Sequence, residues 1–177
     1  MTETRLRATR ADDTRAAGRA LARVLRAGDL VVLSGGLGAG KTTFTQGLGE
    51  GLNVRGQVAS PTFVIARVHP ALGDGPDLVH VDAYRLGSLD EVDALDLDTS
   101  LADSVTVVEW GTGKVEALAA DRLEIELLRP QGTGAGAAGA GGPVDLTALG
   151  DDAPREIVVR PVGERWDGVD LTALAGA

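Results

Sequence analysis

Short apolar runs alternate with amphipathic segments along most of this chain. Runs of about four to six apolar residues predict strands buried on both faces, and we expect such strands at residues 30–34, 62–68, 78–82, 105–109, 123–128 and 156–162. Apolar residues at helical spacing predict helices at residues 11–27, 41–50 and 88–95, although Gly47, Gly49 and Gly51 weaken the far end of the second helix. Strands separated by helices favour a three-layer α/β fold, in which helices cover both faces of a mostly parallel sheet of about seven strands.

One segment departs from this alternation. Residues 131–142 read QGTGAGAAGAGG and contain no side chain that could anchor a core. We therefore predict a single domain over residues 1–177, with a flexible Gly/Ala-rich insertion at residues 131–150 between the last two strands. Loops that join neighbouring strands are usually about two to five residues long, so this segment decorates the domain and does not form part of its core.

Composition and charge narrow the possible functions. The chain has no cysteine, which excludes a disulfide framework and a thiol nucleophile, and His69 and His80 lack the spacing of zinc ligands. Its start, MTETRLRATR, has no apolar signal region, and no apolar run approaches the roughly 20 residues of a membrane helix, so we expect a cytoplasmic protein without membrane contact. The net charge is −9, and residues 74–109 carry ten acids against Arg85 alone. This charge disfavours autonomous DNA or RNA binding, whereas the acidic segment could attract a basic or RNA-bound partner.

The most specific motif follows the apolar run at residues 30–33. Residues 35–42 read GGLGAGKT and fit the phosphate-binding loop pattern GxxxxGK[ST] between a strand and a helix. In such a loop the backbone N–H groups cradle the phosphates, Lys41 reaches the β and γ oxygens, and the Thr42 hydroxyl ligates magnesium. The cradle is expected to consist of Gly36, Leu37, Gly38, Ala39 and Gly40. The motif predicts a P-loop NTPase-like fold that binds a nucleoside triphosphate with Mg2+, and the absence of a guanine-reading NKxD motif favours ATP.

Two acids stand where a phosphate loop needs a magnesium ligand. Asp82 and Glu109 each end a predicted strand, and the carboxyl ends of parallel strands meet at the edge of the sheet that carries the loop. At least one of them is expected to hold magnesium. The alternative for either acid is that it caps the element that follows.

Four segments in this order resemble one family. They are GGLGAGKTTFTQGL at residues 35–48, SPTF at residues 60–63, HVDAYRL at residues 80–86 and VEWG at residues 108–111. Together they resemble the bacterial TsaE (YjeE) family of P-loop ATPases in tRNA threonylcarbamoyladenosine biosynthesis, from about Thr14 to Leu128 and again near residues 155–162. The resemblance implies a Mg2+-dependent ATPase, weak alone, that acts with the partner proteins TsaB and TsaD and reaches ANN-decoding tRNAs through that complex.

The resemblance also implies roles for single residues. Lys41 and Thr42 match the phosphate lysine and the magnesium threonine, Glu109 matches the magnesium-associated acid, and Asp82 matches an acid needed for turnover. Other residues that it places near the nucleotide are Thr43, Ser60, Pro61, Thr62, Trp110 and Arg155, with base contacts near residues 9–14. The family usually has Asp at the position of Gly36, so the polar contribution of that acid is missing here.

Two other functions stay open on the residues alone. A small-molecule kinase would use the same loop but would need an acceptor pocket and usually an arginine-rich lid, and Arg85 is the only arginine between Arg67 and Arg122. A non-hydrolysing nucleotide-dependent binding module would release no phosphate even with its partners present.

Overall fold

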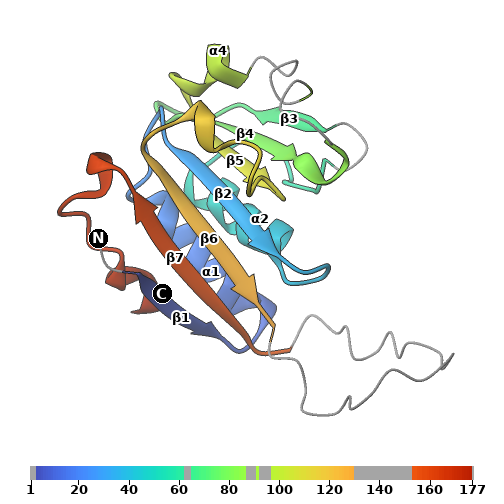
Figure 1. The fold of residues 1–177 in the computed structure, drawn as a ribbon, viewed down its shortest axis with the longest axis vertical. Coiled ribbons are helices and arrows are strands. Elements are labelled where there is room, and N and C mark those ends of the chain that lie inside the picture. Colours follow the sequence, from blue (N-terminus) through green and yellow to red (C-terminus); the bar gives the residue numbers. More distant parts are fainter. Residues whose placement is uncertain (1–2, 62–64, 87–90, 92–96, 130–152, 177) are drawn as a thin grey trace, which may run out of the picture.

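The computed structural model describes residues 3–61, 65–86, 91, 97–129 and 153–176 (Figure 1). The strands in these residues are β1 Thr4–Ala8, β2 Leu30–Gly35, β3 Ala66–His69, β4 Asp77–Asp82, β5 Ser104–Glu109, β6 Arg122–Leu128 and β7 Arg155–Val162. The helices are α1 Ala11–Ala22, α2 Lys41–Gly51 and α4 Leu97–Leu101. Short 3-10 turns are η1 Ala83–Arg85, η2 Glu116–Leu118, η4 Glu164–Trp166 and η5 Thr172–Gly176. No helix in these ranges is long and apolar enough to cross a membrane.

The seven strands form one sheet in the order β1-β7-β6-β2-β5-β4-β3. The four strands β6, β2, β5 and β4 run parallel, whereas β3, β7 and β1 join antiparallel at the two edges. The predicted α/β class is therefore confirmed, with its parallel part at the centre. Glu109 pairs with both Leu33 and Asp82, so the carboxyl ends of β2, β4 and β5 meet at one edge of the sheet.

Helices α1 and α2 cover one face of the sheet (Figure 1). Leu21 of α1 and Phe44 and Leu48 of α2 are buried in the larger core cluster, together with alternate residues of the strands. The glycines that weaken α2 have a packing reason, because a Cβ added at Gly47 would collide with the backbone carbonyl of Arg15 in α1. The loss of helix propensity is therefore offset by a close approach of the two helices.

Among the described residues, the opposite face is covered over β2, β4 and β5, where Leu30 and Val32 of β2 are buried as well. There a second core cluster contains Val79, Val81 and Val108 of the strands, together with Leu97 of α4 and Val115. This short layer replaces the long helices of the first face.

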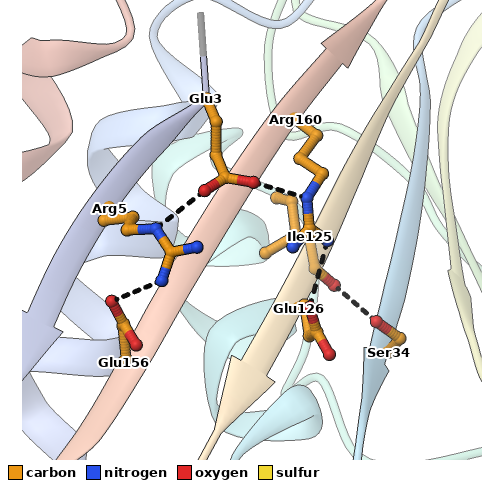
Figure 2. Close-up of polar contacts among 7 residues, drawn as sticks. All are labelled: Glu3, Arg5, Ser34, Ile125, Glu126, Glu156 and Arg160. Carbon is orange, nitrogen blue, oxygen red and sulfur yellow. Dashed lines mark hydrogen bonds and ion pairs between the residues drawn. The ribbon is translucent and has the colours of Figure 1, made fainter.

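Over β1, β7 and β6 the same face carries charged side chains (Figure 2). Glu3 accepts hydrogen bonds from Arg5 at 2.7 Å and from Arg160 at 2.6 Å, while Arg160 also donates to Glu126 at 3.0 Å. Val158 pairs with both Arg5 and Glu126 and is nevertheless fully buried, since the long side chains around it cover its surface with their aliphatic stems. Within the described residues, this part of the sheet face is therefore covered by a network of ion pairs and not by a helix.

Some predicted elements need correction. Helix α1 ends at Ala22 and not at residue 27, because the N–H groups of Arg23 and Val24 turn back to carbonyls three residues earlier and tighten the chain. In the described part of the region predicted as a strand at residues 62–68, the strand begins only at Ala66. Strand β1 was not predicted at all. The helix expected at residues 88–95 and the insertion at residues 131–150 lie outside the described residues, apart from residue 91.

Candidate functional site

The loop between β2 and α2 has the backbone that a phosphate cradle needs. Gly40 precedes α2 with a φ of 103°, and a Cβ at this position would overlap the buried guanidinium of Arg155. Gly36 differs, since its φ is not positive and nothing lies within 4 Å of an added Cβ. Glycine is therefore required at position 40 but not at position 36, and the backbone accommodates the family's usual Asp there.

Lys41 is folded back onto its own loop. Its Nζ donates to the carbonyl oxygens of Gly35 at 2.9 Å and Gly36 at 3.0 Å, and lies 3.7 Å from the centre of the Trp110 ring. Burial lowers the pKa of Lys41, although the charges of Glu109 and Asp82 act in the opposite direction. The ammonium group thus sits among dipoles, an aromatic face and two acids, at the position from which the motif requires it to reach phosphate.

Glu109 is the centre of a buried polar cluster. The Thr42 hydroxyl lies 3.0 Å and 3.3 Å from its two carboxylate oxygens, and His80 Nε2 lies 2.8 Å from Oε1. His80 is fully buried and Glu109 is 3% exposed. The sequence suggested no role for His80 beyond zinc binding, which its spacing excluded, and this contact was not predicted.

The same cluster fits the predicted metal. Thr42 and Glu109 bring one hydroxyl and one carboxylate together, which suits Mg2+, an ion that prefers oxygen ligands and is usually held by one or two carboxylates together with substrate phosphates and water. Among the described residues no group of three or more His, Cys, Asp or Glu could hold a metal ion. Two side chains supply only part of the coordination shell of Mg2+, and the rest would come from water or substrate phosphates.

Asp82 caps the element that follows it, which was the alternative role for this acid, and it also contacts a second predicted site residue. Its Oδ1 accepts the backbone N–H of Tyr84 at 3.0 Å and so caps η1. Its Oδ2 accepts the hydroxyl of Ser60 at 3.3 Å, which ties the acid to the start of the SPTF segment. Asp82 is 5% exposed. Thr62, the predicted phosphate contact in that segment, lies outside the described residues.

Trp110 follows Glu109 in a conformation that is unusual for a bulky residue. Its φ is 60°, and its backbone N–H donates to the backbone carbonyl of Leu33 at 2.9 Å. The indole packs between Lys41 and Tyr84, whose ring centre is 5.2 Å away. Strained backbone of this kind persists where the surrounding contacts fix it, and such positions cluster at functional sites.

These side chains converge on one cavity of about 220 Å³. It is lined by Leu37, Gly38, Ala39, Gly40, Lys41, Thr42, Thr43, Ser60, Asp82, Glu109 and Trp110. A larger cavity, of about 410 Å³, opens beside Arg15 and Gln46 and contains none of the loop residues.

Two arginines approach the loop from the sheet side. Arg155 of β7 lies against Gly40. Arg129 follows β6 directly, and its Nη1 would lie 3.6 Å from a Cβ added at Gly38. The resemblance predicted that Arg155 lies near the loop, whereas the position of Arg129 was not predicted. The only available signal for Arg129 was its position directly after a predicted strand, and that signal does not distinguish it from a surface arginine.

A glycine-rich loop between a parallel strand and a helix, with Lys and Thr at the start of the helix, defines the class of P-loop proteins. Comparison with known proteins narrows this class. The family model described as "Threonylcarbamoyl adenosine biosynthesis protein TsaE" matches residues 8–135. The chain belongs to the TsaE family.

Individual relatives agree with this assignment. A Streptomyces coelicolor protein named tRNA threonylcarbamoyladenosine biosynthesis protein TsaE is 60% identical over 162 residues, which cover 90% of this chain and 97% of that protein. The Bacillus subtilis protein of the same name is 35% identical over 169 residues, 94% of this chain and 91% of that protein. The crystal structure of Bacillus subtilis YdiB superposes with a TM-score of 0.65 at 32% sequence identity, covering 94% of this chain and 90% of that one.

Proposed function

We propose that this protein binds ATP with Mg2+, hydrolyses it, and thereby serves the threonylcarbamoyladenosine modification of ANN-decoding tRNAs in the cytoplasm, together with TsaB and TsaD. The observation that carries the proposal is the 3.0 Å hydrogen bond between the Thr42 hydroxyl and Glu109. It joins the metal position of the loop to a buried acid on the neighbouring parallel strand. The names of the relatives in S. coelicolor and B. subtilis support the tRNA pathway.

Each residue of the cavity has a distinct part in this proposal. Lys41 exchanges the carbonyl oxygens of Gly35 and Gly36 for the β and γ phosphate oxygens, because both sets of oxygens are acceptors for an ammonium group. Thr42 and Glu109 would hold Mg2+, which when bound would neutralise charge on the phosphate oxygens.

Asp82 is the candidate for orienting the attacking water. Its carboxylate lines the cavity and is bonded to Ser60, so it links the water position to the SPTF segment. Through this contact, ATP binding would change the conformation around Ser60, which a partner protein could contact. We therefore propose weak hydrolysis by the protein alone and faster hydrolysis in the complex.

Phosphate release in the presence and absence of TsaB and TsaD tests the proposal. We expect slow basal release that rises when the partners are added. Asp82→Asn should keep ATP binding and lose turnover, whereas Asp77→Asn, at the other end of β4 and bonded to the N–H of Ala71, should keep both. Phosphate on a small acceptor would favour the kinase. Tight ATP binding without any release, even with both partners, would favour the binding module.

A further inference from the structure

We propose that His80 is a positioning residue that holds the carboxylate of Glu109 in place against Thr42. The inference deepens the proposed function, because it concerns the acid assigned to Mg2+. The underlying contact is the 2.8 Å approach of His80 Nε2 to Glu109 Oε1, between two side chains with almost no solvent exposure.

The sheet register explains why a residue on β4 reaches an acid on β5. His80 pairs directly with Val107, and Glu109 lies two residues further along β5 on the same face. Diagonal neighbours at this spacing meet only through long or aromatic side chains. An imidazole spans the gap, and a valine or alanine at position 80 would not.

The two ring nitrogens of His80 differ in their surroundings. Nε2 faces the carboxylate of Glu109, which accepts hydrogen bonds, so Nε2 is the donor of this contact. Nδ1 is buried without a hydrogen-bond partner among the described residues. An unpaired buried polar atom destabilises a fold, whereas an apolar residue of similar size would avoid that cost. A purely structural role therefore does not account for a histidine here.

The expected consequence concerns the metal. Thr42 contacts both carboxylate oxygens, so it does not by itself decide how the carboxylate is turned. The hydrogen bond from His80 to Oε1 fixes that rotation and leaves the second oxygen and the threonine lone pairs in a defined direction. Groups that orient a metal-ligating side chain typically change metal affinity or activity by about 10–100-fold when they are removed.

Glutamine and asparagine separate positioning from packing. The amide nitrogen of Gln is as many bonds from Cβ as His Nε2, so His80→Gln keeps a donor near Glu109. The amide nitrogen of Asn corresponds to Nδ1, so His80→Asn removes that donor. The measurement is the affinity of the full-length protein for ATP by calorimetry, with and without Mg2+, because it does not require hydrolysis. His69→Gln is the matched control, as His69 is also a buried histidine, on the neighbouring strand β3.

We expect His80→Asn to raise the Mg2+ concentration for half-maximal enhancement of ATP binding by about 10–100-fold, and His80→Gln to raise it by less than about tenfold. Metal-free ATP binding should be unchanged in both. Equal shifts in the two variants, no shift in His80→Asn, or an equal shift in His69→Gln would overturn the proposal. If His80→Asn does not fold, His80→Met takes its place, since it fills the site without a donor. If Mg2+ enhances ATP binding but no hydrolysis occurs, the proposed ATPase activity is refuted and the role of His80 is not. If ATP binding by the unaltered protein does not depend on Mg2+, the role of His80 is refuted.

Discussion

Two glycines of the phosphate loop should respond in opposite ways to the same substitution. Gly40 has a φ of 103°, a region that side chains disfavour by about 1–2 kcal/mol, and its added Cβ would also meet the buried guanidinium of Arg155. Gly36 has open space and no positive φ, so alanine there should stabilise the protein by about 0.4–1 kcal/mol through the lower entropy of the unfolded chain.

The assay is thermal unfolding followed by circular dichroism. At about 2–4 °C per kcal/mol for a domain of this size, Gly40→Ala should lower Tm by about 2–8 °C and Gly36→Ala should raise it by about 1–4 °C. Gly36→Asp, which introduces the residue usual in the family, should fold as stably as the unaltered protein. If Gly36→Ala lowers Tm as much as Gly40→Ala does, the backbone argument for the loop is wrong.

Three further outcomes are expected. Lys41→Ala should weaken ATP binding at least about tenfold in calorimetry, because a hydrogen bond to a charged group contributes about 1.5–3 kcal/mol, whereas Lys114→Ala, whose Nζ donates to the Ala83 carbonyl, should bind normally. In a Trp166→Phe protein only Trp110 remains, and its fluorescence should change when ATP draws Lys41 away from the indole; an unchanged spectrum at saturating ATP would contradict that movement. Burial, and to a smaller extent the neighbouring His80, lowers the pKa of His69 below 6.5. As the pH falls, His69 is therefore protonated in the unfolded state at a higher pH than in the folded state, so the stability of the fold decreases from above pH 6.5 towards the lowered pKa. His69→Gln should flatten this slope in denaturant unfolding between about pH 8 and pH 5, and equal slopes would contradict the assignment.

Much of the candidate nucleotide site could be predicted from the sequence because its signals are local. The loop from Gly35 to Thr42 is a contiguous pattern, and Asp82 and Glu109 each follow an apolar run, so sheet geometry alone predicted that they would meet. The glycines of α2 were correctly recognised as weak helix formers. Their reason, contact with α1, depends on a helix that is distant in sequence.

What could not be predicted depends on neighbours from other parts of the chain. Strand β1 has only Leu6 and Ala8 as apolar residues, and it becomes a strand because β7 supplies its hydrogen bonds. The contact between His80 and Glu109 needs the register of β4 on β5, which no periodicity specifies. The positive φ of Trp110 is likewise imposed by its surroundings, since tryptophan has no intrinsic preference for it.

The antiparallel pair of β1 and β7 also has a consequence for the order of folding. It joins the two ends of the described chain, and Glu3 and Arg160, which bond across it, are 157 residues apart in sequence. Contacts of such long range form late and slow the search for the native state, because the loop must close before the contact stabilises anything. During synthesis on the ribosome, β1 emerges first and stays without its strand partner until β7 has followed it. Strand β2, which leads into the phosphate loop, pairs with β5 and β6 and with neither β1 nor β7. We therefore expect the candidate nucleotide site to form before the sheet is complete.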